Sequence, residues 1–446
     1  MSETVPPDLL IRRVTVVSAV DGAAPITNAM IGIRGNRIAS IGPDDPAATA
    51  SCVLDLPGRV VTPGFVNVHT HAILCMVRGV AADVGFAPSY TPGIPNGADV
   101  RPDEARALAR LGALEALLFG STLIADNFIH ADATVDAMAE LGLRVHAAWR
   151  INDVDFAAVA RGHWTFDAAI GDTLLRKALD LHDRHDGTYN GRVRVHLAPH
   201  APDTCSDDYL RRVATEAHAR GTMVATHLAQ STGEVDRVRA RSGRSPAELL
   251  DDVGLLDDRL VAAHCIHLDA ADIARIGAAR VNVAHIPKCN AASGRMAPIG
   301  RLRSAGANLA LATDTQHGDM VELMRWALAV ARIEAGRVAD DWQPEDVLAM
   351  ATRNGARAIG LAPDSGTLVP GAPADLVAFD FRRPHLVPHN DPVGTLVHTG
   401  QGRDVDVVIV DGRIVVERGV PTRVDADAIL REGAAAATAL WERARV

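Results

Sequence analysis

Cysteine and long apolar stretches are both scarce in this sequence. Its five cysteines (Cys52, Cys75, Cys205, Cys265 and Cys289) are scattered and form no CxxC pair. An odd, dispersed set of thiols argues against a disulfide framework or a thiolate metal site and is typical of a cytoplasmic protein. No apolar run approaches the roughly 18 residues that span a bilayer, and residues 1–13 lack the basic and apolar regions of a secretory signal. We therefore expect no association with a membrane.

An excess of basic charge is also missing. The chain has 45 basic and 55 acidic residues, a formal net charge of −10, and no dense cluster of lysine and arginine. Nucleic-acid-binding proteins usually present a basic patch, so we expect no nucleic-acid partner. What is present is an ordinary globular composition in 446 residues, 48% of them hydrophobic. That length accommodates a large core, since an α/β barrel takes about 250 residues.

Both ends of the chain are predicted to be rich in β-strands. Residues 31–42 and 405–419 each contain two short apolar runs around a turn pair, Gly35-Asn36 and Asp411-Gly412 respectively, a pattern that favours hairpins. Residues 374–380 form a further apolar run. We expect these strands to join into one small sheet domain, with the central region inserted between them. The expected boundaries are 1–59 with 366–425 for the sheet domain, 60–365 for the central domain, and 426–446 for a C-terminal helix.

The central region alternates between short apolar runs and amphipathic segments. Helical spacing of apolar residues is clearest in 102–119, 206–220 and 318–335. Eight strands separated by helices favour a (β/α)8 barrel of the TIM type. A doubly wound open sheet is the alternative, but no glycine-rich phosphate fingerprint follows the first strand. The expected strands cover residues 60–68, 120–126, 143–149, 193–199, 222–228, 259–265, 280–286 and 307–313.

Polar residues fall at the C-terminal end of nearly every expected strand. The active sites of such barrels lie at this rim, so the strand ends are predicted to converge on one pocket. A single strand-end histidine is more often a packing residue than a ligand. His69 and His71 differ, because residues two apart in a strand share a face. The strand-end residues, in chain order, are His69 and His71, Asp126 and Asn127, Trp149 and Arg150, His200, His227, His264, His285 and Asp314.

We expect a metal centre formed by His69, His71, His227 and Asp314. Neutral imidazoles with one carboxylate suit Zn²⁺, with Fe²⁺ or Mn²⁺ as alternatives, and one open position allows water to bind. A bound divalent ion lowers the pKa of that water towards about 7. Asp314 is then the expected base, and His264 is placed to hydrogen-bond the water or a developing oxyanion.

These residues lie in stretches that resemble the amidohydrolase superfamily, in the branch that contains triazine hydrolases and the S-adenosylhomocysteine, guanine and 8-oxoguanine deaminases. The resemblance covers almost the whole chain and keeps the order and spacing of the motifs. The matching stretches are VTPGFVNVHTH (61–71), MVRG (76–79), HLAPHAP (196–202), THLAQSTGEV (226–235), AAHCIHLD (262–269), VAHIPKCN (283–290), LATD (311–314), and the tail segments GTLVPGAPADLVAFD and VIVDGRIVVERG.

The resemblance implies one divalent metal ion held by the four expected ligands, with His264 assisting the attacking water. It also implies that His200 and Arg150 contact a small-molecule substrate. The terminal strands would form the small β-sandwich that is typical of the family. A homo-oligomer, a dimer or larger, is implied as well.

The sequence departs from this branch at two places. Its deaminases usually carry a glutamate three residues after the strand-five histidine, which protonates a ring nitrogen. Here Gln230 stands at that position, and an amide transfers no proton at neutral pH. Glu234 is a nearby acid, although the family has a similar acid there without a catalytic role. The second departure is residues 83–100, which are expected to form a lid that contacts substrate through Phe86 and Tyr90.

The predicted function is hydrolysis of a C–N bond other than a peptide bond. A metal-bound hydroxide would attack an sp² carbon of a nitrogen-containing, heterocyclic compound, with Asp314 taking a proton. Deamination is the leading reaction, and Gln230 is expected to orient the substrate. Hydrolysis of an amide, lactam or carbamate is the alternative, because Asp314 alone can then protonate the leaving nitrogen. A non-catalytic scaffold is the remaining alternative, but such a protein would be expected to lose metal ligands.

Overall fold

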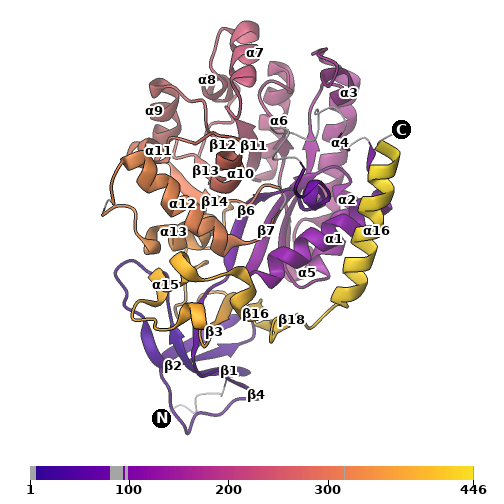
Figure 1. Cartoon of the computed structure of the whole chain (residues 1–446). Coiled ribbons are helices and arrows are strands. Elements are labelled where there is room, and N and C mark those ends of the chain that lie inside the picture. Colours follow the sequence, from indigo (N-terminus) through magenta and orange to yellow (C-terminus); the bar gives the residue numbers. More distant parts are fainter. Residues whose placement is uncertain (1–6, 81–93, 96–98, 316, 339, 445–446) are drawn as a thin grey trace.

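The computed structural model describes residues 7–80, 94–95, 99–315, 317–338 and 340–444. Strands from the two ends of the chain form one sheet of nine strands, in which β5 pairs with β15 and so connects the two ends. This sheet lies at the lower end of the molecule in Figure 1. Its strands are β1 (Leu9–Val16), β2 (Ile26–Arg34), β3 (Arg37–Pro43), β4 (Cys52–Asp55), β5 (Arg59–Pro63), β15 (Leu376–Asp380), β16 (Val405–Val410), β17 (Arg413–Glu417) and β18 (Val420–Pro421).

Both predicted hairpins are confirmed. Strands β2 and β3 pair antiparallel with Arg34 opposite Arg37, and β16 and β17 pair with Val410 opposite Arg413. The glycine of each turn pair has a positive φ, 57° for Gly35 and 73° for Gly412. Glycine adopts this left-handed conformation without the steric cost that other residues incur. The turn residues therefore determine where each strand reverses.

The central region contains two parallel sheets. In one, β6, β7 and β8 pair in order, and β8 also pairs with β9 and β10. In the other, β11, β12, β13 and β14 pair in order. Single parallel bridges join their edges, from Thr70 to Asp314 on one side and from Leu197 to Val224 on the other. The strands are β6 (Phe65–Thr70), β7 (Ser121–Phe128), β8 (Arg144–Ile151), β9 (Val193–Val195), β10 (Ala198–Pro199), β11 (Val224–Leu228), β12 (Leu260–His264), β13 (Asn282–His285) and β14 (Asn308–Leu311).

The first expected strand, 60–68, is two strands in the structure. The chain leaves the terminal sheet at the end of β5 and enters the parallel sheet at β6, with Gly64 between them. A Cβ on Gly64 would lie 2.2 Å from side-chain atoms of Thr122, so only glycine fits at this crossing. Apolar periodicity alone does not reveal such a break, because residues on both sides of it are buried.

Helices follow most of the parallel strands. Their amphipathic faces form the large core between sheets and helices. The expected helical segments at 102–119, 206–220 and 318–335 are confirmed, and residues 426–444 of the last segment are helical. The helices are α1 (Pro102–Leu118), α2 (Ala131–Ala139), α3 (Phe156–Val159), α4 (Ala168–His185), α5 (Thr188–Gly191), α6 (Asp207–Arg220), α7 (Thr232–Ser242), α8 (Pro246–Asp252), α9 (Ala270–Ala278), α10 (Pro287–Ala292), α11 (Ile299–Ala305), α12 (Met320–Ala335), α13 (Pro344–Ala351), α14 (Arg353–Ala358), α15 (Pro392–Thr399) and α16 (Ala426–Ala444).

Side chains alternate between the two faces of the parallel strands. In β8, Val145, Ala147 and Trp149 join the core beneath the helices, so His146 and Arg150 point to the opposite face. That opposite face carries its own apolar cluster, which includes Val66, Ala125 and Ala263 and many other small residues. Among the described residues, no helix combines the length and apolar character that crossing a bilayer requires.

Candidate metal centre

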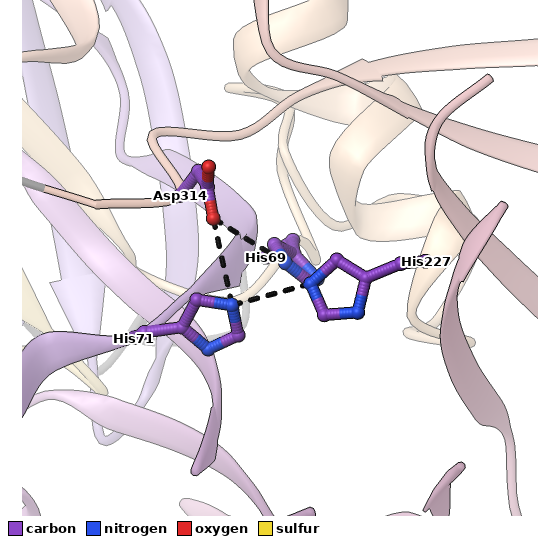
Figure 2. Close-up of side chains that lie close together, drawn as sticks. All are labelled: His69, His71, His227 and Asp314. Atoms are coloured by element: carbon purple, nitrogen blue, oxygen red, sulfur yellow. Dashed lines mark hydrogen bonds and ion pairs between the residues drawn. The ribbon is translucent and has the colours of Figure 1, made fainter. Parts of the chain in front are cut away.

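Four predicted ligands from separate parts of the chain meet at the C-terminal ends of the parallel strands. His69 lies in β6 and His71 directly after it, His227 lies in β11, and Asp314 follows β14. One ligand atom from each lies within 4.8 Å of all the others, and all four side chains are buried. Figure 2 shows the three rings and the carboxylate pointing toward one another. Backbone hydrogen bonds fix their spacing, since Asp314 N donates to His69 O and His71 N donates to Asp314 O.

Backbone carbonyls orient two of the histidines. Nδ1 of His71 donates to Asn127 O over 2.5 Å, and Nδ1 of His227 donates to His200 O over 2.6 Å. With a proton on each Nδ1, the Nε2 atoms carry lone pairs, and these two atoms face each other at 3.4 Å. Two lone pairs at this distance repel unless a cation lies between them. Ligating histidines are usually oriented by a hydrogen bond from the other ring nitrogen in this way.

His69 presents its Nε2 atom to the same centre, 3.8 Å from Oδ1 of Asp314. That nitrogen is buried without a hydrogen-bond partner among the described residues, and the buried carboxylate of Asp314 has only the weak thiol donor of Cys289 beside it. For His69 to bind a metal through Nε2, its Nδ1 carries the proton. In the structure it is the amide nitrogen of Asn127 that lies 3.3 Å from this Nδ1, so the side-chain amide has to turn over for its oxygen to accept the hydrogen bond.

Burial sets the charge of these groups in a way that suits a cation. It lowers the pKa of His69 and His71 well below their usual range and that of His227 to about 4, so the imidazoles are neutral. It raises the pKa of Asp314 to about 7, because no described positive group compensates the carboxylate. A divalent ion supplies that charge and requires neutral imidazole ligands. The four residues therefore fit a single divalent metal ion, and zinc suits this ligand set best.

Two site residues adopt backbone conformations that side chains other than glycine seldom adopt. His264 has a φ of 71° and Asp314 a φ of 62°. Left-handed conformations of this kind cost about 1–3 kcal/mol each and concentrate at functional sites. His264 is the last residue of β12, and Asp314 follows the end of β14 by three residues, so in both cases the unusual φ helps to set the direction of a side chain near a strand end.

His264 belongs to a chain of three buried side chains. Its Nδ1 lies 2.9 Å from Oδ1 of Asn290, and its Nε2 lies 2.9 Å from Nε2 of Gln230. Because the Asn290 oxygen only accepts, Nδ1 carries the proton, and Nε2 accepts a hydrogen bond from the Gln230 amide. Burial lowers the pKa of His264 to about 3, which keeps this ring neutral. Nε2 of His264 is thus an acceptor, and the Gln230 amide occupies it in this structure.

Glu234 stabilises the backbone turn that precedes α7. Its two carboxylate oxygens accept the backbone N–H groups of Ala229 and Gln230, over 2.7 and 2.8 Å. Ala229 has a left-handed φ of 50°, and the carboxylate holds this turn in place. Ser231 in turn caps α7 by accepting the backbone N–H of Glu234. Glu234 therefore fixes the main chain that presents Gln230.

Arg150 and His200 lie beside the ligand cluster. The Arg150 guanidinium stacks over the rings of Phe128 and Phe156, 4.6 and 4.9 Å from their centroids. The ring of His200 packs edge-on against Phe156, and its Nδ1 donates to Thr204 Oγ over 2.9 Å. The positive charge of Arg150 contributes to the lowered pKa of His71, His200 and His227. The structure thus brings both expected substrate contacts to the metal centre.

The remaining expected contacts, Phe86 and Tyr90, lie outside the described residues, as does most of the expected lid at 83–100. Sequence reasoning missed Asn290, Phe156 and Arg295, whose Nη1 donates to Gln230 O over 3.4 Å. Asn290 ends the matching stretch VAHIPKCN, a position that signalled its involvement. Phe156 and Arg295 carried no signal, because each follows a strand end by several residues.

Comparison with known proteins identifies the family of this chain. Residues 60–415 match the model of the Amidohydrolase family. A 5-methylthioadenosine/S-adenosylhomocysteine deaminase from Moorella thermoacetica is 36% identical over 433 residues, 94% of this chain and 97% of that protein. A 5'-deoxyadenosine deaminase from Methanosarcina acetivorans is 30% identical, over 98% of this chain and 99% of that protein.

Two solved structures are also similar. An adenosine deaminase from Xanthomonas campestris with bound zinc has a TM-score of 0.86 and 26% identity, over 99% of each chain. Atrazine chlorohydrolase from Arthrobacter aurescens TC1, complexed with zinc, has a TM-score of 0.86 and 25% identity, over 96% of this chain and 100% of the other. Both relatives bind the metal that the ligand set here suits.

Proposed function

The chain belongs to the amidohydrolase family and is a metal-dependent aminohydrolase of nitrogen heterocycles, and we propose that it removes the exocyclic amine of a 6-aminopurine, as base or nucleoside. The observation that carries the proposal is the set of buried side chains around one centre, four ligands beside the His264–Gln230 pair. Relatives that align over nearly the whole chain are named as deaminases of adenosine derivatives.

His69, His71, His227 and Asp314 would hold the metal. A divalent ion bound there acidifies water, so that hydroxide is present at neutral pH. Asp314 accepts the proton of the attacking water and delivers it to the departing amine.

Gln230 and His264 would position the reactants. With Nδ1 protonated toward Asn290, Nε2 of His264 is an acceptor, which suits the attacking water rather than an oxyanion, and the water would take the place of the Gln230 amide on this atom. An amide NH₂ group has two protons. Gln230 uses one toward His264 and has a second for the ring nitrogen of the substrate. This bond orients and polarises the ring without transferring a proton.

Arg150 and His200 would recognise the rest of the substrate. Arg150 brings a fixed positive charge into a buried pocket between two aromatic rings, where it favours an electron-rich or anionic group. The Nε2 atom of His200 is an acceptor because its Nδ1 donates to Thr204. An acceptor of this kind suits a hydroxyl or amine of the substrate. Phe86 and Tyr90 remain proposed contacts.

Hydrolysis of a lactam, amide or carbamate is the second candidate, and Gln230 favours it. These reactions need no proton on a ring nitrogen, so an amide in place of an acid does not slow them. Asp314 then protonates the leaving nitrogen directly. The two candidates differ in their products, since only deamination releases ammonia from an intact ring.

We also propose the architecture that places these groups. The two bridges between the parallel sheets support closure into a (β/α)8 barrel within residues 60–365, with β6 as its first strand because residues 60–63 pair into the terminal sheet as part of β5. Residues 1–59 and 366–425 would be the composite β-sandwich domain, and residues 426–446 the C-terminal helix. The homo-oligomer and the cytoplasmic location stay predictions.

A substrate screen tests the function. Zinc-loaded protein would be incubated with adenine, adenosine, 5'-deoxyadenosine, pterins, triazines, cyclic ureides and lactams, with ammonia and product mass both measured. We expect ammonia and replacement of the amine by a hydroxyl for at least one aminopurine. Asp314→Asn protein serves as the control for contaminating activity. Ring opening of a lactam or ureide, without ammonia from any aminopurine, would establish the second candidate instead.

A further inference from the structure

A second group of charged side chains lies at the opposite ends of the parallel strands. Asn282 and Asn308, the first residues of β13 and β14, line a cavity of about 690 Å³. A smaller cavity of about 290 Å³ is lined by residues that precede β11 and β12, including Met223 and Arg259. We call this side of the sheets the strand-start face. At roughly 3.3 Å per residue, the four steps from Leu260 to His264 separate it from the metal centre by about 13 Å.

The two cavities are neighbours. Asp258 and Arg357 line both of them. Arg357 belongs to α14, which lies across the strand-start face and contributes Ala356 and Ala358 to the apolar cluster inside the sheets. Elsewhere this face is covered by the terminal sheet, because Arg144 at the start of β8 forms ion pairs with Asp375 and Asp411. The cavities therefore open on the part that the terminal sheet leaves uncovered.

The walls of these cavities are basic, although the whole chain has a net charge of −10. Two aspartates, Asp258 and Asp346, line them together with six arginines, a net charge of +4. The arginines are Arg280, Arg303 and Arg353 in the larger cavity, Arg194 and Arg259 in the smaller, and Arg357 in both.

Five of these arginines already form an ion pair with an aspartate. Arg280 pairs with Asp258, Arg303 with Asp346, and Arg194, Arg259 and Arg353 with aspartates outside the cavity walls. Arg357 differs from them. It is exposed, its side chain donates no hydrogen bond to any described residue, and only its charge reaches Asp21 through space. Its guanidinium thus has its five N–H groups available where the two cavities meet.

A buried histidine adds an independent polar group. His196 lines the smaller cavity and is only 1% exposed, yet neither of its ring nitrogens has a hydrogen-bond partner among the described residues. Buried polar groups are nearly always paired, so this ring needs a partner that the protein does not provide. A neutral imidazole has one donor and one acceptor, and its N–H suits an oxyanion.

We propose that the strand-start face binds a small metabolite with a phosphate or carboxylate group, held by Arg357 and reached by His196. The arginine fork pairs with two oxygens of such a group at once. A cavity of about 690 Å³ is in the range of small-molecule sites. This site is separate from the metal centre and does not rest on the proposed reaction.

Titration calorimetry of the zinc-loaded protein tests the proposal, with inorganic phosphate and succinate as probes and sodium chloride of equal ionic strength as the reference. We expect saturable binding of at least one probe, at least tenfold weaker in Arg357→Gln because a charged hydrogen bond contributes about 1.5–3 kcal/mol. Arg357→Lys should be weakened less. Arg431→Gln, which removes an exposed arginine from α16, should bind as the unchanged protein does.

The two probes distinguish the sources of the oxyanion. Preference for phosphate indicates a phosphorylated ligand, and preference for succinate a carboxylate. Anion binding that is equally strong in Arg357→Gln would place the anion elsewhere, at the metal centre above all, and would overturn the proposal. So would the absence of saturable binding of either probe. Circular dichroism and the melting temperature of Arg357→Gln check that the variant is folded.

Discussion

The side-chain amide of Gln230 donates a hydrogen bond to Nε2 of His264 over 2.9 Å. An acid at position 230 would be in contact with the same ring nitrogen, so the choice of an amide affects two residues at once. With glutamine, His264 stays neutral and accepts. With glutamate, its Nε2 would be drawn to take a proton, and the ring would then no longer be an acceptor for water.

We expect Gln230→Glu to lower kcat/KM on the native substrate and Gln230→Ala mainly to raise KM. Loss of one neutral hydrogen bond costs about 0.5–1.5 kcal/mol, which corresponds to a roughly 2- to 13-fold change. Steady-state kinetics of both folded, zinc-loaded variants provide the measurement. A many-fold increase of kcat in Gln230→Glu would show that the enzyme needs an acid here and that our interpretation of Gln230 is wrong.

Asn290 should act as a positioning residue through His264. Removal of its oxygen in Asn290→Ala frees the imidazole to protonate on Nε2, so we expect kcat to fall about tenfold with little change in KM. Asn290→Asp keeps an acceptor at the same place and is the matched control. If both variants lose the same activity, or if KM rather than kcat changes, the side chain does not act by fixing the tautomer of His264.

Each chain should hold about one divalent ion, and His71→Ala or His227→Ala should lose both ion and activity. Removal of one of the three imidazoles weakens binding of the ion. When the ion is lost, the negative charge of the buried Asp314 carboxylate is no longer compensated. Metal content after exhaustive dialysis provides the test. His218→Ala removes an exposed histidine of α6 and should keep its ion. Full occupancy in His227→Ala would exclude this residue as a ligand.

Asp314→Asn should remain folded and lose turnover by about 10²–10⁴-fold, the usual contribution of a general base. Asparagine keeps the shape of the side chain but accepts no proton. Single-turnover rates with metal content measured in parallel separate a slower reaction from loss of the ion. Near-normal kcat in a folded, metal-loaded variant would rule out Asp314 as the base.

Asp126 should make the stability of the metal-free protein depend on pH. Burial raises its pKa from 3.8 to about 7, although Oδ1 accepts the backbone N–H of Ala72. The folded state therefore retains a proton that the unfolded state releases. This group reduces the free energy of unfolding as pH rises from about 4 to 7, by on the order of 4 kcal/mol in all.

Chelator-treated Asp126→Asn protein should lack this dependence. The difference between its urea midpoint and that of the unchanged protein should increase from pH 5 to pH 7 and then stay constant. Asp132→Asn, which changes an exposed aspartate on α2, is the control. Parallel midpoint curves for Asp126→Asn and the unchanged protein would contradict the assignment.

The sequence by itself determined the metal centre and most of the elements around it. His69 and His71 share a face because strand side chains alternate, and strand ends of a parallel sheet meet at one edge. Those rules are local, so residue spacing was sufficient to group His69, His71, His227 and Asp314. The hairpins at Gly35-Asn36 and Asp411-Gly412 were equally local, since the turn glycines set the reversal.

Tertiary structure alone decided what each of the other polar residues does. Glu234 resembles a candidate acid in the sequence, but the fold brings its carboxylate onto two backbone N–H groups. Asn290 and Gln230 are 60 residues apart, and only packing puts both on His264. Arg357 lines the two cavities together with five other arginines, which come from segments that no sequence motif connects. Such contacts depend on distances between elements, and these follow from how the whole core packs rather than from the pattern of any one segment.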